Sequence, residues 1–215
     1  MPKARIILAE DHELVAEGIL RIVGDEFDIV ETVGDGIALL DRCAVVRPDI
    51  VLTDMAMPKL NGLDALTQIK QKFPRTSVIV LTGSADVNLA TESFRAGASG
   101  YVLKHAAATE LITALREVWQ GRTFVTPRIA QDVLQRLMQP QSAMDDGEPE
   151  LTSRERQVLQ LIAEGNSSKE AAAVLEISAR TVEFHKRNVM KKTGLGSAAE
   201  LARYASKIGL VADPS

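Results

Sequence analysis

The first 120 residues alternate short apolar runs with longer amphipathic segments. The short runs are rich in Ile and Val and predict five strands, at residues 4–9, 27–33, 49–53, 77–82 and 100–104. Between and after them, apolar residues recur at helical spacing and predict five helices, at residues 13–23, 36–46, 62–72, 86–96 and 107–120. Because the strands are apolar throughout their middle, they fit burial on both faces. This order predicts a doubly wound α/β domain with a five-stranded parallel sheet.

The end of the chain shows helical periodicity only. Residues 151–215 contain four amphipathic segments separated by short turns. Thr152, Ser168 and Ser178 stand where they can cap the first three helices, and Glu155 can complete a capping box with Thr152. We therefore expect a small all-α domain of four helices.

A change in composition separates the two parts. Residues 127–138 predict a connecting helix, and residues 141–150 carry four acidic and no basic side chains, which is typical of a linker. We expect domains at 1–122 and 151–215, joined by residues 123–150. The whole chain has a net charge of −4, but residues 151–215 carry ten basic and seven acidic side chains. This basic end favours a polyanion as partner.

No apolar run approaches the roughly 20 residues that span a bilayer. The N-terminal apolar stretch is short and is followed at once by acidic residues. We therefore expect a cytoplasmic protein without a membrane partner.

Polar side chains stand where four of the predicted strands end. They are Glu10, Asp11, Asp54, Thr82 and Lys104. Because the carboxyl ends of parallel strands meet at one edge of the sheet, we expect these groups in one crevice. Clustered carboxylates repel one another, and a hard cation such as Mg²⁺ (or Mn²⁺) relieves that repulsion. A lysine and a hydroxyl beside the metal suit phosphoryl oxygens. The sequence has no glycine-rich nucleotide loop, so the simplest interpretation is a carboxylate that itself accepts a phosphoryl group.

These residues belong to four motifs, AEDHELV, LTDMAMPKLNGLDAL, VIVLTGSAD and AGASGYVLK. Over about residues 1–120 the motifs together resemble the receiver domain of two-component response regulators, and this resemblance implies a flavodoxin-like fold. The resemblance implies that Asp54 takes a phosphoryl group from a sensor histidine kinase. It implies that Asp11, Asp54 and the backbone carbonyl of Ala56 hold the metal, with Glu10 acting through water.

The same resemblance implies which residues respond to phosphorylation. Thr82 and Lys104 would bind the phosphoryl oxygens, and Tyr101 would be the aromatic side chain that turns inward when Thr82 moves toward the phosphate. The face formed by the fifth strand and its flanking helices is the expected output surface.

The C-terminal part resembles the DNA-binding domain of NarL/FixJ, or LuxR-type, regulators over its full length, through LTSRERQVLQLIAEG, KEAAAVLEIS and RTVEFHKRNVMKK. Residues 179–193 would be the recognition helix of a helix-turn-helix, with five basic side chains against one acidic. By resemblance Glu183, Phe184 and Arg187 face base edges, although Glu183 could instead pair with Arg187 one turn on. The predicted DNA-binding residues are Ser168, Lys169, Arg180, Thr181, Glu183, Phe184, His185, Lys186, Arg187, Lys191 and Lys192.

We therefore expect a transcriptional response regulator that dimerises and binds promoters after phosphorylation at Asp54. Its expected partners are a histidine kinase, double-stranded DNA and a second copy, with RNA polymerase as a further candidate. It would not be an enzyme in the usual sense, but a phosphoacceptor that promotes its own phosphorylation and dephosphorylation. Two alternatives stay open: a phosphate-independent dimeric DNA-binding regulator, and a small-molecule phosphatase that uses Asp54. The phosphatase lacks a second aspartate two residues after Asp54, where Ala56 stands.

Overall fold

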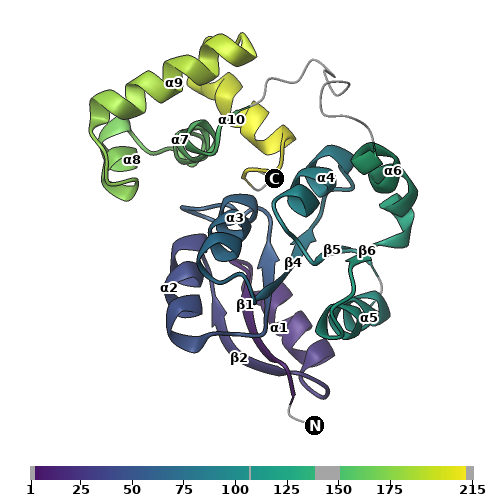
Figure 1. Cartoon of the computed structure of the whole chain (residues 1–215). Coiled ribbons are helices and arrows are strands. Elements are labelled where there is room, and N and C mark those ends of the chain that lie inside the picture. Colours follow the sequence, from purple (N-terminus) through teal and green to yellow (C-terminus); the bar gives the residue numbers. More distant parts are fainter. Residues whose placement is uncertain (1–2, 107, 139–150, 212–215) are drawn as a thin grey trace.

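The computed structural model describes residues 3–106, 108–138 and 151–211. The predicted linker at residues 141–150 lies outside the described residues. An α/β domain, purple to teal in Figure 1, is followed by a smaller all-helical domain, green to yellow. Within the described residues, no helix has the length and apolar character needed to cross a membrane.

The N-terminal domain is built on a parallel sheet with the order β2-β1-β3-β4-β5-β6. The strands are β1 (Arg5–Ala9), β2 (Asp28–Val33), β3 (Ile50–Asp54), β4 (Ser77–Thr82), β5 (Gly100–Leu103) and β6 (Phe124–Val125). The predicted fold class is confirmed, but the sheet has six strands and not five. The sixth strand has only two residues, too few to produce a periodic pattern in the sequence.

Helices cover both faces of this sheet. They are α1 (Glu13–Val23), α2 (Gly36–Val46), α3 (Gly62–Lys72), α4 (Val87–Arg95) and α5 (Ala108–Trp119). One apolar core lies between the sheet and α2, α3 and α4, and a second lies between the sheet and α1 and α5. The doubly wound arrangement leaves the carboxyl ends of the strands open to the loops, where the polar residues lie.

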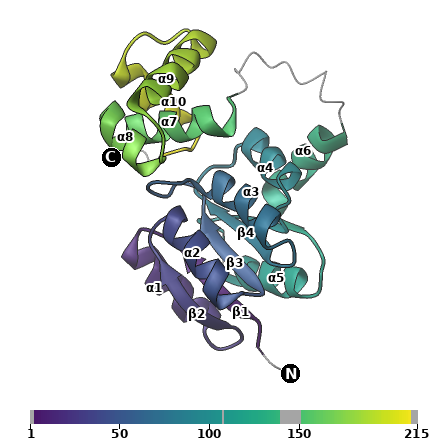
Figure 2. The same cartoon turned by 60° about the vertical axis from the view of Figure 1, so that its left-hand side comes forward.

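The connecting helix α6 (Pro127–Met138) packs against α4. Its side chains Ile129 and Val133 are buried in the same core cluster as Tyr101 of β5. Figures 1 and 2 show α6 beside α4 at the edge of the domain. The surface around β5 that was expected to carry the output is therefore partly covered by the chain's own connecting helix and by β6.

The C-terminal domain contains α7 (Ser153–Ala163), α8 (Ser168–Val174), α9 (Ala179–Thr193) and α10 (Ala198–Lys207). Thr152 and Glu155 form the predicted capping box of α7, and Ser178 caps α9. The prediction for the second helix is wrong, because Ser167 and not Ser168 is its N-cap. Adjacent serines carry the same sequence signal, and the backbone conformation decides between them.

Candidate functional site

The structure brings the predicted strand-end residues to one edge of the sheet. Carboxylate oxygens of Glu10, Asp11 and Asp54 and a ring nitrogen of His12 all lie within 4.8 Å of one another. His12 Nδ1 is 2.9 Å from Asp11 Oδ1, a contact that the strand-end argument did not predict. Thr82 ends the next strand, one residue after the partner of Asp54 in the sheet register.

Lys104 joins two of these carboxylates. Its Nζ atom lies 2.8 Å from Asp54 Oδ2 and 2.7 Å from Glu10 Oε2. Burial raises the pKa of Asp54, and Lys104 only partly offsets that effect. Burial also acts to lower the pKa of Lys104, but the charges and hydrogen bonds of Asp54 and Glu10 outweigh it, so the pKa of this ammonium group is raised. Lys104 therefore stays charged and holds the two carboxylates in place.

The cluster carries more negative than positive charge, which favours binding of a cation. Three carboxylates, from Glu10, Asp11 and Asp54, face one ammonium group, from Lys104. Glu10 and Asp54 are each only 3% exposed, so water screens their excess negative charge poorly. Oxygen donors in this number suit a hard divalent ion such as Mg²⁺. The residues present thus fit the metal that the sequence predicts.

Tyr101 already points inward in this structure. Its side chain is fully buried, and its hydroxyl lies 3.4 Å from the carbonyl oxygen of Ser84. Burial raises the pKa of the Tyr101 phenol, and a hydrogen bond with Thr82 opposes this effect. Thr82 Oγ1 also accepts a hydrogen bond from the Ser84 backbone N–H. The two predicted switch residues are therefore in contact.

The loop that follows Asp54 is held tightly. The Ala56 N–H donates to the Asp54 carboxylate, and the Gly62 N–H donates to the Met55 carbonyl over 2.8 Å. A methyl group at Gly62 would collide with the carbonyl oxygen of Asp54, so only glycine allows this close approach. The loop therefore keeps a fixed position relative to Asp54. We call residues 55–61 the acceptor loop.

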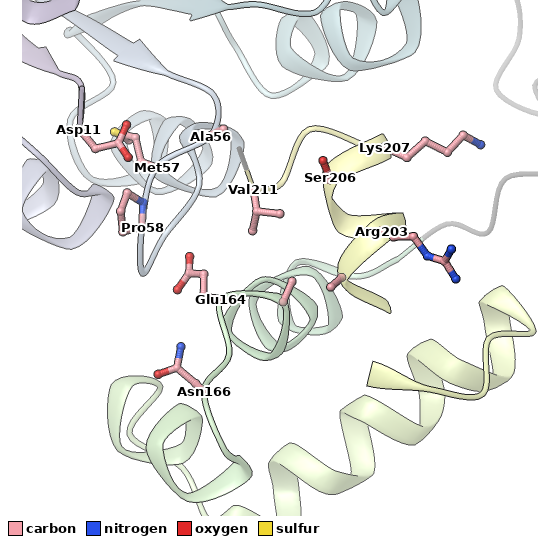
Figure 3. A pocket seen from close by; sticks show the side chains of 12 residues that line it. Asp11, Ala56, Met57, Pro58, Glu164, Asn166, Arg203, Ser206, Lys207 and Val211 are labelled. Atoms are coloured by element: carbon pink, nitrogen blue, oxygen red, sulfur yellow. The ribbon is translucent and has the colours of Figure 1, made fainter. Parts of the chain in front are cut away.

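A cleft of about 900 Å³ lies between the two domains beside this cluster. Figure 3 shows Asp11, Met57 and Pro58 on one side and Glu164 and Asn166 on the other. The labelled basic side chains of α10 extend away from Asp11 in that view. The cleft therefore gives access to the cluster, but the α10 cations do not complete it.

Helix α9 lies on the side of its domain that faces away from the α/β domain (Figures 1 and 2). Val182 and Val189 anchor it in the domain core. Phe184 is 53% exposed, an unusual position for a large aromatic side chain. The outer surface of this helix is therefore accessible in the docked arrangement. Its exposed side chains include Arg180, Phe184, Arg187, Lys191 and Lys192.

Several of the predicted DNA-binding residues have partners inside the domain. Glu183 accepts a hydrogen bond from Ser168 and lies 3.9 Å from Lys186, so its described contacts are not with Arg187. Lys192 Nζ lies 2.6 Å from Glu155 Oε2 in the α7 capping box. The charge of Lys192 is thus already paired with the carboxylate of Glu155 on α7.

Comparison with known proteins agrees with this geometry. Residues 6–116 match the response regulator receiver domain, and residues 149–205 match the LuxR family of bacterial regulatory proteins. The oxygen regulatory protein NreC of Staphylococcus carnosus is 34% identical over 210 residues, covering 94% of this chain and 97% of that protein.

Solved structures of RcsB are also similar. RcsB from Salmonella enterica serovar Typhimurium, bound to a promoter in the presence of the phosphomimetic BeF₃⁻, aligns with a TM-score of 0.69 at 28% identity, covering 96% of this chain and all of that one. A structure of two RcsB dimers bound to two parallel DNAs aligns with a TM-score of 0.59 at 27% identity, covering 95% and 98% of the two chains.

The fold and the acidic strand-end cluster thus define a receiver domain linked to a helix-turn-helix domain. The chain belongs to the response regulators that carry a LuxR-family DNA-binding domain. It is a DNA-binding response regulator of a two-component system.

Proposed function

We propose that Asp54 accepts a phosphoryl group from a sensor histidine kinase. The observation that carries this proposal is the position of Lys104, which reaches Asp54 and Glu10 at the ends of three different strands. An ionised carboxylate needs no general base to attack phosphorus. Lys104 and Thr82 then stand beside Asp54 to bind phosphoryl oxygens. This arrangement lets the protein promote its own phosphorylation and dephosphorylation.

Asp11, Asp54 and the carbonyl oxygen of Ala56 would hold Mg²⁺, with Glu10 acting through water. When bound, the metal neutralises the charge that builds up on the phosphoryl oxygens. The excess of carboxylates over ammonium groups in the cluster supports this assignment. Mn²⁺, with similar ligand preferences, would serve as a substitute.

We propose further that phosphorylation promotes dimerisation and promoter binding through α9. The RcsB structures support this step, because they contain dimers bound to DNA and a promoter complex with a phosphomimetic. The predicted contacts on α8 and α9 remain our DNA-binding surface except for Lys192, whose charge is paired with Glu155. RNA polymerase is a proposed partner at the promoter.

The test uses the full chain, Mg²⁺ and a small phosphodonor such as acetyl phosphate. Asp54→Asn is compared with wild type and with Asp28→Asn, which makes the same change at an exposed position. Intact mass, oligomeric state and DNA retention are followed at two salt concentrations. We expect wild type and Asp28→Asn to gain one phosphoryl group, dimerise and bind DNA more tightly, and Asp54→Asn to do none of these.

Other outcomes would favour the two alternatives. Many turnovers of the donor without a change in assembly would favour the phosphatase. Equal DNA binding by all three proteins, with no reaction, would favour a phosphate-independent regulator.

A further inference from the structure

Four exposed residues of α9 form one stripe along the helix. They follow one another at the spacing i, i+4, i+7 and i+11, which keeps them on a single face. The stripe consists of Arg180, Phe184, Arg187 and Lys191. Val182 and Val189, which are buried in the domain core, lie on the opposite face of the helix. The stripe is therefore the part of α9 that points furthest from its own domain.

Phe184 is an apolar side chain among the cations of this stripe. It is 53% exposed. A single exposed apolar residue is common on protein surfaces and by itself has no meaning. Here, however, Arg180 precedes it and Arg187 and Lys191 follow it on the same face. Because cations on one face favour contact with a phosphate backbone, they would bring the Phe184 ring against DNA.

The length of the stripe fits the width of the major groove. Arg180 and Lys191 are eleven residues apart, which corresponds to about 16 Å along a helix. The major groove of DNA is about 12 Å wide. The cations at the two ends of the stripe can therefore reach the phosphates that border the groove. Phe184 lies between them, where the helix faces the base edges.

The neighbours of Phe184 in the chain hold its ring and leave it unshielded. The ring packs edge-on against His185, with 5.5 Å between the ring centroids and an angle of 72° between the planes. Such a contact limits the rotation of the ring before DNA binds. On the other side, Glu183 accepts a hydrogen bond from Ser168 of α8 and lies 3.9 Å from Lys186. The one acidic side chain of α9 is thus engaged beside the stripe and not on it.

A phenyl ring distinguishes between base edges by what it covers. The apolar group in the major groove is the 5-methyl group of thymine, whereas the other base edges present hydrogen-bond donors and acceptors. Covering those polar atoms with a ring that offers them no partner is costly. We propose that the Phe184 ring contacts the 5-methyl group of one thymine in the site bound by each α9, so that this regulator selects its operators partly by that methyl group. The inference rests on the proposed DNA-binding surface and adds the base feature that the surface recognises.

The test uses the full chain with Mg²⁺ and acetyl phosphate, and a DNA site selected by wild type from a random duplex library. Each thymine of that site is replaced in turn by deoxyuridine, which pairs with adenine in the same way and lacks only the 5-methyl group. Fluorescence anisotropy at one salt concentration gives the Kd of each duplex for wild type, Phe184→Ala and Lys191→Ala. Lys191 lies on the same stripe and is the matched control. Both side chains are exposed, so their removal leaves the fold intact.

At one thymine for each bound α9, uracil should weaken wild-type binding about fourfold, the effect of leaving one methyl-sized group unburied. Phe184→Ala should bind the thymine duplex more weakly than wild type and should not distinguish it from the uracil duplex. Lys191→Ala should bind both more weakly and keep the fourfold difference.

Three outcomes would overturn the thymine contact and leave DNA binding through α9 standing. Wild type could tolerate uracil at every position, or Phe184→Ala could keep the difference between thymine and uracil. Phe184→Ala could also bind the thymine duplex as tightly as wild type, which would assign the ring to a protein partner. If wild type selected no sequence and bound no duplex, the proposed function and this inference would both be overturned.

Discussion

Tyr101 of β5 is paired in register with Val125 of β6, and its side chain is completely buried. The proposed switch residue thus lies beside β6 and shares a core cluster with α6, and both elements come after the five-stranded unit predicted from the sequence. Any outward movement of Tyr101 must displace side chains of the cluster to which Ile129 and Val133 of α6 belong. The connecting segment is therefore part of the receiver core as well as a tether between domains.

The packing of α6 can be tested with two neighbouring residues. Val133 is 1% exposed, whereas Leu134 is 54% exposed. Val133→Ala should lower the free energy of unfolding of the receiver by about 2 kcal/mol, because it removes buried methyl groups. Leu134→Ala should change it by less than about 0.5 kcal/mol. Urea unfolding followed by the fluorescence of Trp119 measures both, and equal effects would show that α6 is not docked in solution.

The sequence was most informative where a pattern repeats or a motif has a fixed order. Apolar periodicity predicted α1 to α10, the connecting helix α6 included, and the strand-end argument placed Asp54 beside Lys104, where the structure has their ion pair. Short or long-range features were missed. The two residues of β6 carry no period, and nothing local in the sequence distinguishes Gln160 from a solvent-exposed glutamine on α7. Its burial depends on a surface about 100 residues away in the chain.

The tight fit of the acceptor loop predicts a selective effect of adding one methyl group. Gly62→Ala should destabilise the receiver by about 1–3 kcal/mol, because the new atom meets the Asp54 backbone. Gly83→Ala is the control: a methyl group there meets nothing within 4 Å, although Gly83 directly follows Thr82. Thermal unfolding of both variants measures the difference. If Gly62→Ala were as stable as Gly83→Ala, the loop would be more adaptable than its contacts indicate.

Lys191 and Lys192 are adjacent, but they should contribute differently to DNA binding. Lys192 pairs with Glu155, whereas Lys191 is exposed and belongs to the proposed DNA-binding surface. Lys191→Ala should weaken binding to all sequences alike and lower the slope of log affinity against log salt by about 1. Lys192→Ala should change that slope much less. The affinity of each variant, measured at several salt concentrations, gives the slopes, and the opposite order would place Lys192 at the DNA.

The stabilisation that the Lys192–Glu155 pair gives to the helix-turn-helix domain should depend on pH. Burial raises the pKa of Glu155, but the hydrogen bonds from Lys192 and Thr152 outweigh it and hold the pKa of this carboxyl below its ordinary value of 4.5. A carboxyl whose pKa is lowered on folding stabilises the folded state fully above its unfolded pKa. That stabilisation is lost as the pH falls through the lower, folded-state pKa. The helix-turn-helix domain should therefore lose the contribution of this pair in acid.

Lys192→Met tests this contribution, with Lys191→Met as the matched control on the exposed side of the same turn. At pH 7 the Lys192 variant should be less stable by about 1 kcal/mol, the upper end for a partly exposed ion pair. The deficit should shrink as the pH is lowered below 4.5, because Glu155 then becomes protonated in both proteins and the pair no longer distinguishes them. Hydrogen exchange of the α7 and α9 amides, corrected for the intrinsic pH dependence, measures local stability. A deficit that is the same at pH 7 and in acid would mean that Lys192 stabilises the domain through packing of its stem and not through its charge.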